Sequence, residues 1–92
     1  MTTAPTGGPS LTLLGKPDCH LCHEMREVVM RVLPGSGVGL VERDVRDDPE
    51  TKQRYLLEIP VLLFGEREIA RHRITEAELR ERLERLVPGG RA

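Results

Sequence analysis

Apolar residues in this chain form short continuous runs and longer stripes with helical spacing. The run LTLL at residues 11–14, stopped by Gly15 and Pro17, predicts a buried strand. From residue 21 onward the apolar side chains recur at the i, i+4, i+7 and i+8 spacing of an amphipathic helix, at Leu21, Met25, Val28, Val29, Val32 and Leu33. Pro34 ends this stripe, so the pattern predicts a strand that leads almost directly into a helix.

The middle of the chain predicts the same order again. Residues 38–45 carry three valines and follow a Gly-Ser-Gly turn, which favours a second strand. The residues DDP at positions 47–49 supply a capping carboxylate and a proline suited to the first helical position. We expect this helix to cover residues 49–57 and to stop before Ile59-Pro60, because a residue that precedes proline is disfavoured in the α region.

The last third of the chain predicts a hairpin and a helix. Residues 60–64 form an apolar run with proline first, Gly65 turns the chain, and residues 68–71 supply the returning strand. Thr75 and Glu78 have the spacing of a capping box, which predicts the start of the final helix. Ile74 and Leu79 lie at the two positions of a hydrophobic staple, and the apolar stripe of the helix is Leu79, Leu83 and Leu86. The helix also carries three Glu–Arg pairs four residues apart: Glu76/Arg80, Glu78/Arg82 and Glu81/Arg85.

These elements follow the order β-α-β-α-β-β-α. Two strand–helix–strand connections require parallel pairing with right-handed crossovers, so we predict an α/β fold with a four-stranded mixed sheet and helices on both faces. We expect one domain over residues 10–88, between a flexible N-terminal tail at residues 1–9 and a C-terminal tail at residues 89–92. A chain of 92 residues can bury one modest core of this kind.

Charge and composition narrow the range of functions. The 14 Lys and Arg and the 15 Asp and Glu are interspersed, which gives no electrostatic reason to expect nucleic acid or an anionic membrane as a partner. We expect neither a signal peptide nor a membrane span, since no segment approaches the ~18 to 20 apolar residues that cross a bilayer. We therefore expect a cytoplasmic protein, in which two cysteines three positions apart are catalytic or metal-binding rather than structural.

Both cysteines lie in the segment CHLCH at residues 19–23. This spacing serves three chemistries: exchange between a dithiol and a disulfide, metal ligation, and attachment of haem. Cys19, His20, Cys22 and His23 offer ligands for zinc, copper(I) or an iron–sulfur cluster, but a closed zinc site usually draws its second ligand pair from a distant segment, and the chain has no other cysteine. A cytochrome would need an export signal and a haem-sized apolar pocket, which the pattern does not predict. A redox-sensing binding domain without turnover also stays open.

The order of elements and two motifs resemble the thioredoxin-fold superfamily and, within it, a small glutaredoxin-like protein. The two motifs are the Cys19–Cys22 pair between strand and helix and the IPV segment at residues 59–61, and Lys16 three positions before Cys19 also matches the family. The resemblance implies a thioredoxin fold and a thiol–disulfide oxidoreductase. It also implies that Pro60 is cis, lies against the disulfide and leaves a backbone edge free for a substrate strand.

The resemblance covers residues 11–87 and departs from the family at the ligand site. Glutaredoxins that bind glutathione usually carry Gly-Gly and Asp after the hairpin, where this chain has ARHRIT at residues 70–75, and usually carry Tyr where it has Leu21. Glutathione is therefore a candidate ligand whose usual motif is not evident, and we expect no tightly bound cofactor. An ordinary thioredoxin differs at three further places, which are here Leu13, Asp18 and His20-Leu21.

Cys19 and Cys22 are the predicted catalytic pair. Cys19 lies where the first helix begins, and the unpaired N–H groups there favour a thiolate, so we assign it as the nucleophile and Cys22, one turn later, as the resolving thiol. Lys16 and His20 either stabilise the thiolate or are simply solvated. Asp18 beside Cys19 opposes the thiolate, and as a helix N-cap it would stabilise the first turn. The predicted substrate-binding residues are Lys16, His20, Leu21, Ile59 and Pro60, and no metal is expected.

The partners follow from the same assignment. We expect a monomer that acts on protein or small-molecule disulfides, with a thiol reductase or glutathione as electron donor. His23 and His72 are expected to be ordinary surface residues. Arg71 and Arg73 are expected to be solvated, with contact to an anionic substrate as the alternative.

Overall fold

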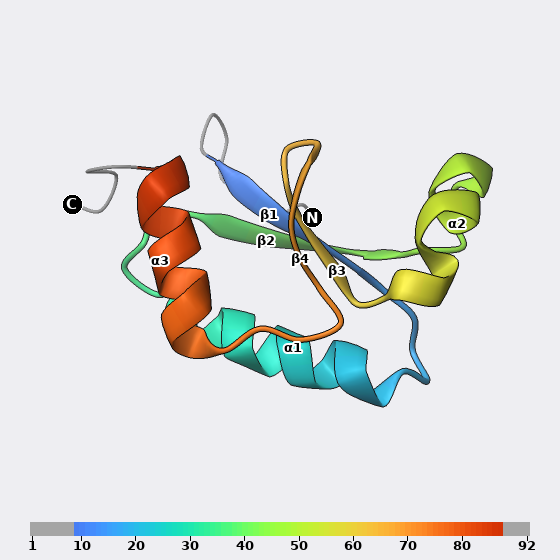
Figure 1. Ribbon diagram of the computed structural model, residues 1–92, viewed down its shortest axis with the longest axis horizontal. Helices are drawn as coiled ribbons and strands as arrows, with labels where there is room; N and C mark the ends of the chain where they lie inside the picture. Colours follow the sequence, from blue (N-terminus) through green and yellow to red (C-terminus); the bar gives the residue numbers. More distant parts are fainter. Residues whose placement is uncertain (1–8, 88–92) are drawn as a thin grey trace.

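Strands and helices follow one another in the predicted order in the computed structural model, which describes residues 9–87 (Figure 1). The elements are β1 (Ser10–Gly15), α1 (His20–Val32), β2 (Gly39–Asp44), α2 (Pro49–Tyr55), the 3₁₀ turn η1 (Leu56–Glu58), β3 (Val61–Phe64), β4 (Arg67–Arg71) and α3 (Glu76–Leu86). Residues 1–8 and 88–92, which include almost all of the two predicted tails, lie outside the described residues. None of the helices within residues 9–87 is long and apolar enough to cross a membrane.

The four strands form one mixed sheet in the order β2-β1-β3-β4. β1 pairs in parallel with β2 and antiparallel with β3, and β3 pairs antiparallel with β4. The parallel pair follows from the crossover through α1. The hairpin follows from the turn at Gly65, whose φ of 63° lies in the left-handed region that glycine adopts freely. The predicted four-stranded mixed sheet is confirmed.

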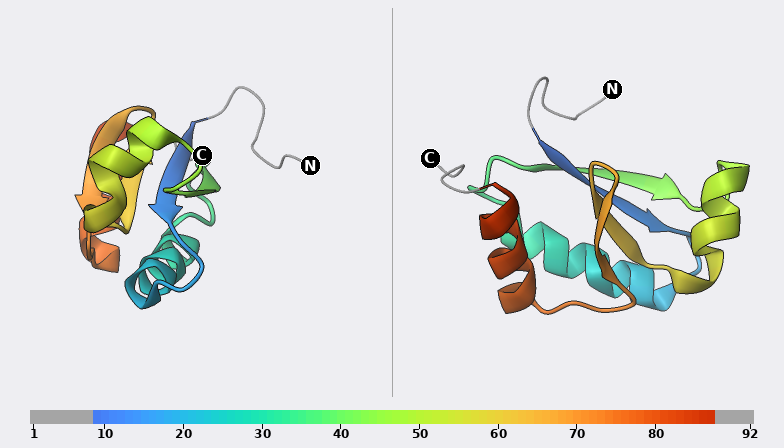
Figure 2. Two further views of the ribbon diagram at one scale, coloured as in Figure 1. Left: turned by 90° about the vertical axis from the view of Figure 1, so that its right-hand side faces the viewer. Right: turned by 45° about the horizontal axis from the view of Figure 1, so that its top comes forward.

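Alternation along the strands divides the core between the two faces of the sheet. Leu11, Leu13 and Leu62 point to the face that α1 and α3 cover, where they pack with Val29 and Leu79. The opposite face carries a smaller cluster that includes residues of α2 and η1: Leu14, Val45 and Val61, with Tyr55, Leu56, Ile59 and Leu63. Figure 2 shows α1 and α3 on one side of the sheet and α2 at its end. Helices therefore pack on both faces, α1 and α3 along one face and α2 with η1 only at the end of the other.

One end of the sheet gathers the segments around the cysteine motif. β1 runs towards this end and continues through residues 16–19 into α1, and α2 and η1 lie at the same end before the chain enters β3 (Figures 1 and 2). The Val45 N–H donates to the Gly15 carbonyl at 2.8 Å, which carries the pairing of the first two strands as far as this junction. Segments far apart in the sequence thus meet where β1 ends.

Side-chain caps start α2 and α3 as predicted. The Asp48 carboxylate caps α2, and Thr75 and Glu78 form the capping box of α3. The predicted ion pair between Glu78 and Arg82 is wrong, because Glu78 serves the cap and Arg82 donates to the Ile69 carbonyl. The other two predicted pairs of α3 form, Glu76–Arg80 and Glu81–Arg85.

Candidate active site

A disulfide joins the two cysteines at the junction of β1 and α1. The Cα atoms of Cys19 and Cys22 lie 5.2 Å apart. Cys19 is the N-cap residue, with extended φ and ψ of −109° and 108°, and Cys22 lies in the first turn of the helix. The Cys19 N–H donates to the Lys16 carbonyl at 3.3 Å and closes the turn that enters α1. The prediction that Cys19 precedes the first turn and Cys22 lies inside it is confirmed.

The Cys19 sulfur caps α1. Its Sγ accepts a hydrogen bond from the Cys22 N–H at 3.1 Å. The alternative that Asp18 caps this helix is wrong, since Asp18 is exposed and one position too early for a chain that turns helical at His20. An N–H donor and the positive end of a helix both favour negative charge on a sulfur at this position.

The two cysteines differ in exposure because of Gly15. Cys22 is 5% exposed, whereas Cys19 is only half-buried. A Cβ placed on Gly15 would lie 2.9 Å from the Cys22 Sγ, so a side chain at this position would collide with the sulfur. Glycine at the end of β1 therefore leaves the space that Cys22 occupies, and Cys19 stays the sulfur nearer to solvent.

His20 and Lys16, the two basic residues nearest the cysteines in the sequence, lie in different places: His20 is exposed on α1, and Lys16 lines a hollow beside Cys22. The His20 side chain is 83% exposed, and its Nε2 lies 2.9 Å from the Glu24 carboxylate. Lys16 lines a hollow together with Cys22 and Asp44. Hydrogen bonds from Arg46 lower the pKa of Asp44 to about 2, and the charge of Lys16 contributes in the same direction. Asp44 is thus a charged carboxylate near Lys16 at neutral pH.

The Ile59–Pro60 peptide bond is cis, as the resemblance implies. Pro60 is fully buried, and its carbonyl accepts the His72 N–H at 2.8 Å. Ile59 packs on the smaller apolar cluster with Leu14 and Val61. Contacts with β1 and with the residue after β4 thus fix the loop that precedes β3.

His72 is exposed, as predicted, but its backbone conformation and its partner were not predicted from the sequence. It adopts a left-handed backbone conformation with φ of 67°, and its Nε2 lies 2.9 Å from the Glu58 carboxylate. Arg71 Nη1 lies 3.1 Å from the same carboxylate. The hairpin register, which pairs Val61 with Arg71, places the next residue beside Pro60. The register shifts between Leu62 and Leu63, so counting back from the turn at Gly65 would misplace His72 by one residue, and the sequence gives no signal for this contact.

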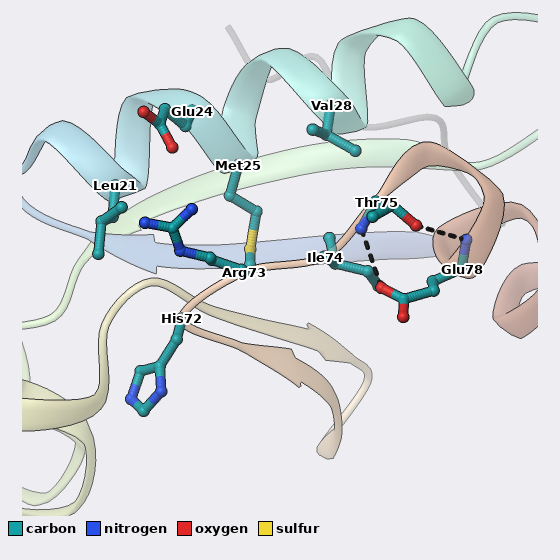
Figure 3. A pocket seen from close by; sticks show the side chains of 9 residues that line it. All are labelled: Leu21, Glu24, Met25, Val28, His72, Arg73, Ile74, Thr75 and Glu78. Atoms are coloured by element: carbon teal, nitrogen blue, oxygen red, sulfur yellow. Dashed lines mark hydrogen bonds between the residues drawn. The ribbon is translucent and has the colours of Figure 1, made fainter.

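A groove runs between α1 and the loop that joins β4 to α3 (Figure 3), and we call it the α1–α3 groove. It has a volume of about 220 Å³ and is lined by Leu21, Glu24, Met25, Val28, His72, Arg73, Ile74, Thr75 and Glu78. The structure divides the predicted substrate-binding residues among several places. Leu21 lines this groove, Lys16 lines the hollow beside Cys22, Ile59 and Pro60 form the loop before β3, and His20 is exposed on α1.

The histidines of the motif do not assemble with the cysteines into a metal site. Within residues 9–87, no three His, Cys, Asp or Glu side chains are grouped so that they could hold one metal ion. The sulfurs of Cys19 and Cys22 bond to each other instead. The arrangement is that of a dithiol–disulfide pair at a helix N-terminus.

Comparisons with known proteins agree with this geometry. A family model described as Glutaredoxin-like domain (DUF836) matches residues 10–84. Target protein XcR50 from X. campestris is 29% identical, with a TM-score of 0.68 over 82% of this chain and 96% of that chain. Two further structures are each 20% identical and share the fold: protein Ne2328 from Nitrosomonas europaea (TM-score 0.67, 85% and 94% covered) and thioredoxin 1 from Thermosipho africanus TCF52B (TM-score 0.60, 84% and 92% covered). No curated protein sequence matches the chain.

Proposed function

The chain belongs to the glutaredoxin-like domain family with a thioredoxin fold, and from this premise we propose that it is a dithiol–disulfide oxidoreductase. The observation that carries the proposal is the hydrogen bond from the Cys22 N–H to the Cys19 Sγ at 3.1 Å. In the reduced protein the same donor would stabilise a Cys19 thiolate. The thiolate is the form that attacks disulfides.

The reaction starts at Cys19. Its thiolate attacks one sulfur of the substrate disulfide, a mixed disulfide forms, and the other substrate sulfur leaves as a thiolate that takes a proton from water. Cys22 then loses its proton and attacks the Cys19 Sγ, which forms the Cys19–Cys22 disulfide and releases the second substrate thiol. Two electrons pass from the protein dithiol to the substrate. A thiol reductase or glutathione is the proposed donor that returns them.

The order of the two attacks follows from the exposure of the sulfurs. Cys19 is half-buried and open to a substrate, whereas Cys22 is buried against Gly15. A buried thiol one helical turn from the mixed disulfide reacts within the molecule, where proximity strongly favours attack. Cys22 is therefore suited to resolve the mixed disulfide rather than to form it.

The proposed substrates are protein or low-molecular-weight disulfides. We assign contact with them to Lys16, His20, Leu21 and Ile59, which lie in or beside the two loops at the end of β1 and on the first turn of α1, and we assign to the buried Pro60 the shaping of the loop that carries Ile59. The proposed protein acts as a monomer, without a tightly bound cofactor. We place it in the cytoplasm, where thiol reductants keep such a pair cycling.

The reduction potential of the pair tests this function. Metal-free protein is equilibrated against glutathione and dithiothreitol ratios, and free thiols are counted by mass spectrometry. We expect a reversible two-electron transition between ~−270 and ~−120 mV. The Cys22→Ser variant should accumulate a mixed disulfide through Cys19, and the Cys19→Ser variant should not.

Two other results would point to other functions. Thiols that form no intramolecular disulfide, or that are protected until a chelator is added, would favour a metal or iron–sulfur site at the motif. A disulfide that forms reversibly while the protein reduces no disulfide substrate would favour a redox sensor without turnover.

A further inference from the structure

The α1–α3 groove has an apolar floor and a small volume. Leu21, Met25 and Val28 on α1 and Ile74 on the facing loop make the floor (Figure 3). The volume of about 220 Å³ is below the ~300 to 1,000 Å³ of typical small-molecule pockets. The groove therefore fits one apolar side chain of a larger molecule better than a whole small ligand.

Two of the charged residues that line the groove already have partners. The Glu24 carboxylate lies 2.9 Å from His20 Nε2. The His72 ring lies 2.9 Å from the Glu58 carboxylate. Neither side chain is therefore free to select a ligand by charge.

The end of the groove at α3 is also engaged. The Glu78 carboxylate accepts the Thr75 N–H at 3.0 Å, and the Thr75 hydroxyl accepts the Glu78 N–H at 3.1 Å (Figure 3). The first-turn N–H groups of a helix would otherwise attract an anion. Because Glu78 supplies that anion from within the chain, a ligand carboxylate finds no free donor at these two positions.

Arg73 is the remaining charged residue of the groove. Within residues 9–87 its guanidinium takes part in no ion pair and no hydrogen bond. Figure 3 shows it extending along α1 towards Leu21 and Glu24. One cation beside an apolar floor complements an acidic group next to an apolar side chain.

The groove begins close to the reactive cysteine. Leu21 stands between the two cysteines in the first turn of α1 and also lines the groove. An extended peptide advances ~3.3 Å per residue. In a polypeptide joined through its cysteine to Cys19, a side chain two or three residues from that cysteine can thus reach the groove.

We propose that the α1–α3 groove selects polypeptide disulfides in which an apolar side chain fills the floor and a neighbouring Asp or Glu contacts Arg73. The proposal rests on the proposed oxidoreductase function and names its substrate class. Glutathione matches the groove poorly, because it has no large apolar side chain and carries two carboxylates for one unpaired guanidinium. Arg73 is a specificity-determining residue, and the chemical step at Cys19 and Cys22 stays as described above.

Peptides with one changed residue test the assignment. Each peptide carries a single cysteine in a mixed disulfide with 2-mercaptoethanol. Leu lies two residues and Asp three residues from that cysteine, and one version of the peptide has this pair before the cysteine and another version has it after the cysteine. Partner peptides replace Asp with Asn or Leu with Ser. Reduced protein is mixed with each peptide in a single turnover, in which the protein dithiol becomes a disulfide and the peptide thiol and 2-mercaptoethanol are released.

The preferred peptide should react faster than both partners. We expect the Asp peptide to exceed the Asn peptide by about two- to fivefold, as for an exposed ion pair, and the ratio to approach one in Arg73→Gln and at high salt. We expect the Leu peptide to exceed the Ser peptide by roughly tenfold. Arg73→Lys should keep part of the Asp preference. Arg67→Gln is the matched control, because it removes an exposed arginine of the hairpin outside the groove and should keep the full preference.

The outcomes separate this proposal from the function on which it rests. Equal rates for all peptides, equal losses of the Asp preference in Arg73→Gln and Arg67→Gln, or a faster reaction with glutathione disulfide than with the Leu-Asp peptide would overturn the groove assignment alone. If the reduced protein also fails to react with 2-hydroxyethyl disulfide, which makes no demand on the groove, the oxidoreductase function fails and the groove assignment falls with it.

Discussion

The N-termini of α1 and α3 share one type of hydrogen bond, in which the N-cap side chain accepts the N–H of the residue three positions later, but the capping atoms differ in chemistry. At α1 the capping atom is the Cys19 sulfur, which accepts the Cys22 N–H at 3.1 Å. At α3 the Thr75 hydroxyl accepts the Glu78 N–H at 3.1 Å, and the Glu78 carboxylate returns a bond to the Thr75 N–H at 3.0 Å. In the proposed mechanism the start of α1 is reactive because its capping atom is itself a nucleophile that solvent can reach. At α3 the chain supplies its own carboxylate, which caps the helix and leaves no nucleophile at the capping position.

The largest effect should come from replacing the capping sulfur with oxygen. Cys19→Ser keeps a good N-cap residue, so the free energy of unfolding of the reduced protein should stay the same or rise slightly. The exchange rate with 2-hydroxyethyl disulfide should fall by more than about 10³-fold, because the nucleophile is lost. Chemical denaturation and single-turnover kinetics of the same sample measure both. A retained exchange rate would show that Cys22 can act first. The capping atom of α1 would then not be the nucleophile, and α1 would not differ from α3 in this respect.

The next largest effect should come from filling the space between Gly15 and the Cys22 side chain. Gly15→Ala would place a Cβ 2.9 Å from the Cys22 Sγ, and such overpacking usually costs about 1 to 3 kcal/mol of unfolding free energy. Urea denaturation of the reduced protein measures the cost. The same substitution in a Cys22→Ala background should cost less, since the colliding sulfur is gone. An equal cost in both backgrounds would show that the sulfur is not the cause and would assign the effect to the Cys22 Cβ, which lies 3.0 Å from the same position and is kept in alanine, or to the backbone of β1.

A smaller effect should follow at α3. Thr75→Ala removes the hydroxyl that accepts the Glu78 N–H, and loss of such a cap typically costs about 1 kcal/mol. The reduction potential of the cysteine pair should not move, because this cap lies on a different helix. Thr75→Ser keeps the hydroxyl and is the matched control, with unfolding close to that of the unchanged protein. A shift in potential that accompanies the stability loss would couple the two helix starts.

The smallest effect is a pH dependence that belongs to α3. A hydrogen bond from the Thr75 backbone lowers the pKa of Glu78 below its ordinary value of 4.5. The folded protein therefore favours the charged carboxylate. This contribution to stability is complete above about pH 4.5 and is lost as the pH falls through the lowered folded pKa. The difference in unfolding free energy between the unchanged protein and Glu78→Gln should shrink from pH 7 to pH 3. A difference that is constant over this range would contradict the cause assigned to the shift.

The features that the sequence predicted well depend on neighbouring residues. The capping box of α3, the cap at Asp48 and the strand patterns need only local spacing, and the structure has them. The position of Cys19 before the first turn of α1 follows from the apolar stripe that starts at Leu21. The cis bond before Pro60 came from the family resemblance, because an isolated sequence favours the trans form.

The features that the sequence did not predict depend on competition or on distant contacts. Asp18 does not cap α1. The hydrogen bond from the Cys19 N–H to the Lys16 carbonyl closes a turn after which Cys19 is the last extended residue, so Cys19 takes the N-cap position. Glu78 and Arg82 have the right spacing for an ion pair, but each side chain has a better partner. Nor does any local pattern reveal that His72 meets Glu58 across the loops.

The burial of Cys22 behind Gly15 also bears on oxidative damage. Peroxide converts an accessible thiolate to a sulfenic acid, and further oxidation to the sulfinic acid is essentially irreversible. In the reduced protein we expect peroxide to reach the half-buried Cys19 first. The shielded thiol of Cys22, one turn away, would then condense with the sulfenic acid to give the disulfide and water. Gly15, which makes room for the Cys22 sulfur, thereby keeps a thiol beside Cys19 that can convert its sulfenic acid to a reducible disulfide.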